Sequence, residues 1–143
     1  MDSAKRVISG TWGEVWLDGE RVSEAYGLQA KVNFDKEDIP MCRQMGVDAK
    51  VTSYKGTGSL RLYKTTSRMA QAIGEYIRDG RDIRFKIISK LKDPDAYGAE
   101  RVTIRNVSFD DLTLADWEAK TTGKVECPFT FTDYEFLDMI DPR

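Results

Sequence analysis

Apolar and polar residues alternate with a period of two along much of this chain, and this pattern constrains the fold more than any other feature. Similar alternation occurs in residues 82–90, 100–109 and 124–132. Side chains that alternate in this way point to opposite faces of a half-buried strand. The sequence therefore predicts a mainly β fold, an antiparallel sandwich or barrel. The clearest example, YGLQAKVNF, puts on one face Tyr26, Leu28, Ala30, Val32 and Phe34.

Two local signals refine this prediction. The sequence EVWLDGERV contains Asp18-Gly19, a dipeptide that tolerates the positive φ angles of a tight hairpin turn. In ERVTIRNVSF the apolar phase shifts by one residue near Arg105-Asn106, which indicates a β-bulge. Both features are typical of an antiparallel sheet.

One helix is predicted at about residues 66–79. Thr66 or Ser67 is suited to cap its start, and Asp79-Gly80 to end it. Its apolar residues recur at helical spacing and are expected to cover one end or face of the sheet. They are Met69, Ile73, Tyr76 and Ile77.

Residues 35–55, DKEDIPMCRQMGVDAKVTSYK, have no clear period and mix charges of both signs. The segment is predicted to be a long loop, and a loop of this length in a small domain is often functional. The whole chain, residues 1–143, is long enough for one domain with one core.

Composition excludes several classes of function. The net charge of −2 and the sequence pI of about 5.3 argue against a nucleic-acid-binding protein, which usually has a basic face. The chain contains no histidine, the commonest general base and metal ligand. Its two cysteines, Cys42 and Cys127, are far apart and are predicted to be reduced. No cofactor or metal site is predicted.

The stretch YKGTGSLRLYKTTSRM raises the question of a phosphate-binding loop. A Walker motif needs a lysine directly after its last glycine and a helix directly after that. Here Gly56 and Gly58 are followed by the alternating residues SLRLY, so the glycines are predicted to serve the entry of a strand into the sheet.

The acidic cluster in FDDLTLADWE has the side chains of an acid–base or cation site. It lacks the spacing of a calcium-binding loop, and a solvated surface is the favoured interpretation. Its members are Asp110, Asp111, Asp116 and Glu118. The sequence thus predicts no enzyme, and unused strand edges instead suggest assembly with other chains.

Four segments carry a resemblance to a known family: VISGTWGEVWLDGE, GTGSLRLYKTTSRM, ERVTIRNVSFDDLTLA and CPFTFTDYEF. In this order and spacing they resemble the tail tube proteins of contractile phage tails, including those of PBSX-like prophages and R-type bacteriocins. The resemblance covers nearly the whole chain.

The resemblance implies a β-sandwich or barrel with one flanking helix, and no catalysis. It also implies hexameric rings stacked into the inner tube of a tail or bacteriocin, a conduit for DNA, other cargo or ions. The implied partners are copies of the chain itself, the tail sheath protein, the baseplate or tube initiator and the tape-measure protein. Assembly is expected in the bacterial cytoplasm, followed by residence in the virion tail or tail-like particle.

The long loop matches the segment that in this family reaches the adjacent ring. The predicted contacts between subunits or rings are Lys36, Ile39, Met41, Arg43, Met45 and Tyr54. The alternative function is a monomeric β-barrel module that binds a ligand or nucleic acid. No segment is apolar over a membrane-spanning length, so no membrane insertion is predicted.

Overall fold

The computed structural model describes residues 4–141 and contains a mainly β fold. All strand pairs are antiparallel, in the order β2-β1-β5-β6-β7-β4-β3, with β8 on β6. The strands are β1 (Gly13–Leu17), β2 (Glu20–Arg21), β3 (Ala25–Pro40), β4 (Val47–Tyr63), β5 (Phe85–Lys92), β6 (Ala99–Phe109), β7 (Lys124–Phe131) and β8 (Asp133–Asp138). Two short 3-10 helices, Ala4–Arg6 and Gly10–Trp12, precede β1.

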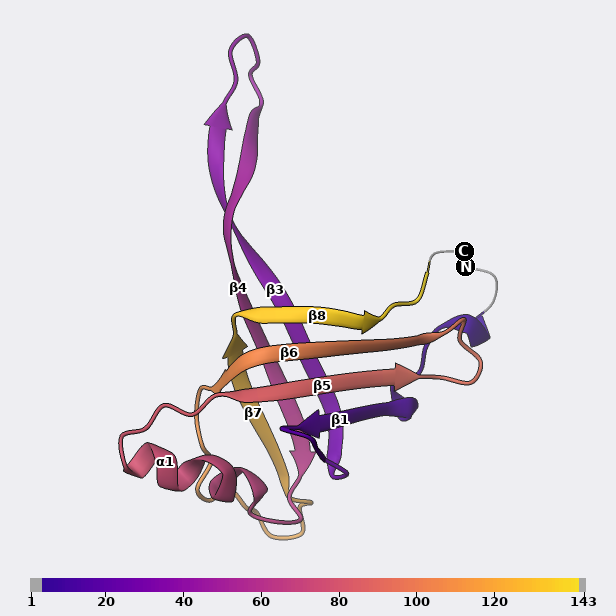
Figure 1. Ribbon diagram of the computed structural model, residues 1–143, viewed down its shortest axis with the longest axis vertical. Helices are drawn as coiled ribbons and strands as arrows, with labels where there is room; N and C mark the ends of the chain where they lie inside the picture. Colours follow the sequence, from indigo (N-terminus) through magenta and orange to yellow (C-terminus); the bar gives the residue numbers. More distant parts are fainter. Residues whose placement is uncertain (1–3, 142–143) are drawn as a thin grey trace.

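The strands form two layers that cross steeply, and the sheet does not close into a barrel. In Figure 1, β1, β5, β6 and β8 run across the view, while β3, β4 and β7 run up it. Of the two predicted architectures the structure is therefore a sandwich, with the helix to one side. The predicted fold class is confirmed.

Strand β6 joins the two layers. Most of it pairs with β5 and β8, whereas its last residues, Ser108 and Phe109, pair with β7. The register against β5 shifts between Phe85 and Ile87, and Asn106 has a φ of 57°. This is the predicted bulge, and it lies where the strand passes from one layer to the other.

The predicted tight turn is also present. Trp16 pairs with Arg21 and Leu17 with Glu20 around Asp18-Gly19. The φ angles of 50° and 88° at these two residues are those of a turn that matches strand twist.

The core lies between the layers and is closed at one end by the helical segment. Leu60, Ile87, Val107 and Phe129 are fully buried. The full set of buried apolar residues is Val15, Leu17, Val22, Leu60, Leu62, Met69, Ile73, Phe85, Ile87, Ile104, Val107, Cys127, Phe129 and Phe131.

The helix lies where the sequence placed it, but only half of its predicted apolar stripe is buried. Its first part, Ala70–Gly74, is a π-helix, followed by α1 (Glu75–Arg78). A π-turn holds more residues than an α-turn, so residues after it are rotated away from the expected face. Tyr76 and Ile77 are 40% and 59% exposed, and their predicted core position is wrong. The predicted stop is confirmed by the positive φ of Gly80.

Residues 35–55 are not a loop. Strands β3 and β4 pair from Ala25 and Leu62 out to Pro40 and Val47, so only residues 41–46 connect them. The prediction of a long loop is wrong because this part of the hairpin is exposed on both faces. A strand that buries neither face does not require alternating apolar and polar residues, so its sequence lacks the period-two pattern.

The start of the helical segment is tied to the sheet by an ion pair. Arg68 Nε donates a hydrogen bond to Glu24, whose side chain is only 7% exposed. Burial raises the pKa of Glu24, but the hydrogen bond and the charge of Arg68 lower it by more, so the pKa lies below its ordinary value.

We expect Glu24→Gln to reduce the free energy of unfolding by about 1–2 kcal/mol at pH 7, because Arg68 loses its ionised partner. The pKa of Glu24 in the folded protein is lower than 4.5, its value in the unfolded chain. Ionised Glu24 therefore stabilises the fold at pH values above 4.5, and this stabilisation is lost as the pH falls through the pKa of the folded state. The deficit should therefore shrink below about pH 4.5 in urea denaturation series.

The matched control is Glu20→Gln. Glu20 lies 3.6 Å from the same guanidinium but is 82% exposed, so its loss should cost about 0.5 kcal/mol or less. Equal losses from the two variants, or a deficit independent of pH, would contradict this account.

Candidate subunit interface

The outer half of the β3–β4 hairpin projects beyond the two-layer body (Figure 1). Every residue from 33 to 55 is exposed, so no second layer supports this part of the hairpin. Isolated two-stranded hairpins are marginally stable in water. The projection is therefore suited to being covered by another chain.

The projection carries large apolar side chains in water. They are Met45 (103% exposed), Val47 (62%), Phe34 (59%), Val51 (50%), Tyr54 (47%), Met41 (46%) and Ile39 (38%). Contiguous exposed apolar side chains rimmed by charged residues are typical of protein interaction sites. This chemistry distinguishes the hairpin from a merely solvated loop.

The structure brings together five of the six predicted contact residues. Lys36 and Ile39 lie on the outer part of β3, on opposite faces because they are an odd number of residues apart. Met41, Arg43 and Met45 lie in the connecting turn, where Arg43 adopts a φ of 63°.

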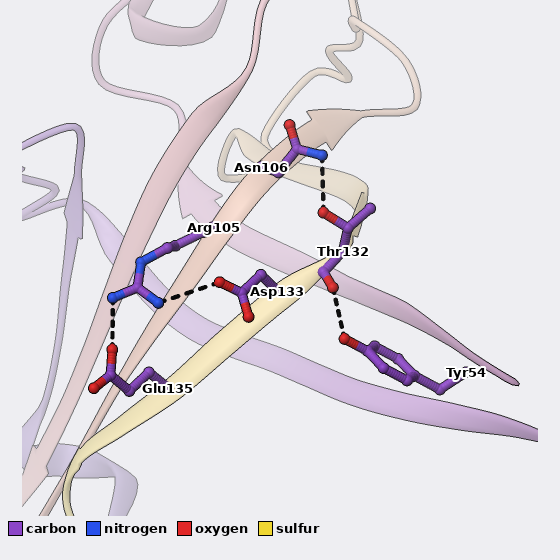
Figure 2. A network of polar contacts seen from close by, with 6 residues as sticks. All are labelled: Tyr54, Arg105, Asn106, Thr132, Asp133 and Glu135. Atoms are coloured by element: carbon purple, nitrogen blue, oxygen red, sulfur yellow. Dashed lines mark hydrogen bonds and ion pairs between the residues drawn. The ribbon is translucent and has the colours of Figure 1, made fainter.

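Tyr54 lies elsewhere, where the hairpin leaves the body. Its hydroxyl donates a hydrogen bond of 2.8 Å to the carbonyl oxygen of Thr132, as Figure 2 shows. Its ring also lies edge-on to that of Tyr134, with centroids 6.4 Å apart. Tyr54 therefore fixes the base of the hairpin within its own chain.

The network around Thr132 extends this support to β6 and β8. Asn106 Nδ2 donates to the Thr132 hydroxyl at 2.8 Å. Arg105 contacts Asp133 at 3.3 Å and Glu135 at 2.6 Å, and hydrogen bonds to these carboxylates raise its pKa. The residues that orient the hairpin thus come from three strands (Figure 2).

Sequence reasoning missed strand β8 and its exposed aromatic residues. Tyr134 and Phe136 are 41% and 42% exposed, and both line an open groove of about 440 Å³ between the layers. Tyr134 and Phe136 alternate with Asp133 and Glu135, and this alternation is the sequence pattern that indicates the strand.

Strand β3 has one free edge. Within residues 4–141 it pairs with β4 along its length and with no other strand. A free edge of 16 residues is a template for pairing with another chain.

The outward face of β3, β4 and β7 is polar. Asn33 Nδ2 donates to Thr57 and Ser59 donates to Glu126, each at 2.9 Å. Pairing in register puts on this face Gln29, Lys31, Asn33, Lys55, Thr57, Ser59, Arg61, Glu126 and Thr130. Such a face needs no cover from another layer of protein.

The glycines of the 54–69 segment and the acidic residues of the 110–118 segment do not form a binding or catalytic site among the described residues. Gly56 and Gly58 lie inside β4 under aromatic rings, where an added Cβ would lie 2.4 Å from Phe131 and 2.5 Å from Phe129. The acidic residues of the 110–118 segment are exposed, and no metal-ligand cluster occurs among the described residues. Over the same part of the chain, no helix has the length and apolar character to cross a bilayer.

The two cysteines differ in environment. Cys42 is exposed in the hairpin turn, and Cys127 is buried in the core. Burial, reinforced by the negative charge of Asp111, raises the pKa of the Cys127 thiol to about 11. A thiol with a raised pKa is a poor nucleophile because little of it is thiolate.

We expect a thiol-reactive dye at pH 8 to label one site per folded, unassembled chain, Cys42, and a second site only after denaturation. The measurement is absorbance titration with and without urea. Cys42→Ser should abolish the fast phase. Rapid labelling of two sites in the folded protein would contradict the buried position of Cys127.

The chain belongs to the phage tail tube protein family, whose model matches residues 2–138. Among curated relatives it is 31% identical to the phage-like element PBSX protein XkdM of Bacillus subtilis (strain 168), over 92% of this chain and 91% of that protein. The predicted family is confirmed.

Solved structures of contractile injection systems share the fold. The anti-feeding prophage tube-terminating cap matches with a TM-score of 0.71 at 12% identity, over 97% of this chain and 96% of its own. A chain of the PVC sheath-tube complex in the extended state matches with a TM-score of 0.69 at 10% identity. The match covers 97% of this chain and 100% of that chain. At these identities the likeness concerns the fold alone.

Proposed function

We propose that this protein assembles into stacked hexameric rings that form the inner tube of a contractile phage tail or tail-like particle. The observation that carries this proposal is the hairpin of residues 33–55, in which every residue is exposed, with its apolar side chains. Family membership and the shared fold with injection-system chains support it.

Within a ring, we assign the lateral contact to the free edge of β3. Backbone groups along this edge can pair with a strand of the neighbouring copy and so extend the sheet around the ring. The polar face of β3, β4 and β7 then lines the channel, because that face needs no cover. This face carries three basic residues and one acidic residue, Lys31, Lys55, Arg61 and Glu126, interspersed with hydroxyl and amide side chains.

Between rings, the hairpin reaches along the tube axis to the next ring. A compact domain of this chain length approximates a sphere about 38 Å across. Six such spheres in a closed ring leave a central hole of about the same width, which is enough for a DNA duplex. DNA, other cargo or ions are therefore possible passengers. The sheath, the baseplate or tube initiator and the tape-measure protein are the proposed partners, with assembly in the cytoplasm before incorporation into the tail.

The test is the state of the purified protein. Negative-stain micrographs should show rings or hollow tubes, and sedimentation should show concentration-dependent assembly. A protein that stays monomeric at high concentration, also alongside baseplate components, would overturn the proposal and favour the monomeric binding module.

A further inference from the structure

We propose that the turn of the β3–β4 hairpin binds the β6–β7 loop, residues 110–123, of a copy in the next ring. This inference rests on the proposed function and assigns the surface that receives the hairpin. The two segments lie at opposite ends of the long axis of the molecule, as Figure 1 shows. A contact between them is therefore head-to-tail, and repeating it builds an open stack.

The loop exposes large apolar residues at its end of the molecule. Leu114 is 87% exposed and Trp117 is 86% exposed. At the other end, Met45 in the hairpin turn is 103% exposed. A tryptophan buries about 150–250 Å² when covered, so leaving Trp117 in water forfeits a large stabilisation.

Charge makes the two segments complementary. Residues 110–123, DDLTLADWEAKTTG, contain four acidic residues and one basic residue, Lys120, so the loop is net negative. The turn itself, residues 41–46, MCRQMG, contains a single charged residue, Arg43, and Asp38 and Asp48 lie on the two strands that flank it. A lone cation among apolar side chains fits a surface on which acidic residues flank a tryptophan.

The loop is anchored so that these residues remain outside. Leu112 is half-buried and packs against the core and near Gly74. Thr121 N donates to the Glu118 carbonyl oxygen, and Lys120 has a φ of 62°, which together form a turn. The segment between these two anchors presents Leu114 and Trp117 to solvent.

The native cysteine in the hairpin turn allows a direct test. Ala115→Cys and Ala119→Cys, both at exposed positions of the loop, are each combined with Cys42. In tubes treated with a mild oxidant we expect disulfide-linked dimers and longer chains on a non-reducing gel. A disulfide needs Cα atoms within about 7 Å, and the hairpin turn and the β6–β7 loop of one chain lie at opposite ends of the molecule.

Two controls keep the test specific. The same loop cysteines with Cys42→Ser should give no ladder, and neither should Met139→Cys, which is 64% exposed on another part of the surface. Tubes without a ladder from either loop cysteine would overturn this inference and leave the proposed function intact. Absence of tubes from the intact protein would overturn both.

A charge exchange tests the same contact without oxidation. Arg43→Glu should raise the protein concentration needed for tubes by about tenfold or more. Adding Asp116→Lys and Glu118→Lys to that variant should restore assembly. Circular dichroism confirms folding at each step. Failure of the exchange to restore tubes, together with an absent ladder, would show that another surface receives the hairpin.

Discussion

Replacing residues 36–52 by Asn-Gly is expected to give a folded protein that no longer forms tubes. The replacement leaves Asp35 paired with Ser53 and closes the shortened hairpin with a favoured two-residue turn. No residue from 33 to 55 is buried, so the core is unaffected. The thermal midpoint should stay within about 5 °C of the intact chain.

Micrographs and sedimentation of the shortened and intact proteins measure the effect. Loss of tubes is expected to be complete because all the exposed apolar residues between 39 and 51 are removed. The variant should still share the circular dichroism of the intact body. Tubes of normal length from the shortened protein would show that the rings stack through other surfaces.

Gly58→Ala is expected to destabilise the fold by about 3 kcal/mol or more. A Cβ at this position would lie 2.3 Å from the carbonyl oxygen of Gln29 and 2.5 Å from the ring of Phe129. Both neighbours are fixed, one in the backbone of β3 and one fully buried in the core. Overpacking of this kind usually costs about 1–3 kcal/mol, and displaced backbone adds to it.

Gly46→Ala in the hairpin turn is the matched control. No atom lies within 4 Å of the added Cβ there, and its φ is not positive. The change should be neutral or slightly stabilising. Urea denaturation followed by tryptophan fluorescence compares the two variants. Equal stability would mean that β4 accommodates a side chain at Gly58 and that the close packing has been overestimated.

Much of the fold could be predicted because its determinants are local. Alternation locates strands that have one buried face, and Asp18-Gly19 and Arg105-Asn106 act through their own backbone angles. The π-helix could not be anticipated from spacing, because it depends on how residues 70–74 pack against the sheet. Its effect was to move Tyr76 and Ile77 to the surface.

Five of the six predicted contact residues lie on the outer hairpin, whose strand conformation the sequence did not indicate. A strand that lacks a buried face has an irregular pattern, so the outer hairpin resembled a loop. The distinct role of Tyr54 depends on Thr132, which lies 78 residues away in the chain. The groove beside β8 likewise forms only when the layers cross.

Strand β4 has an inner part that packs within the fold and an outer part that is exposed. Its inner part, from Gly56 to Leu62, is constrained by aromatic rings and the core, whereas its outer part, residues 47–53, is exposed throughout. Substitutions in the outer part therefore escape the demands of folding. Under the proposed assembly, two lineages of such a protein can diverge there until their subunits no longer co-assemble, while each chain still folds. Mutual exclusion between related particles in one cell would then require only a few changes at the hairpin's end.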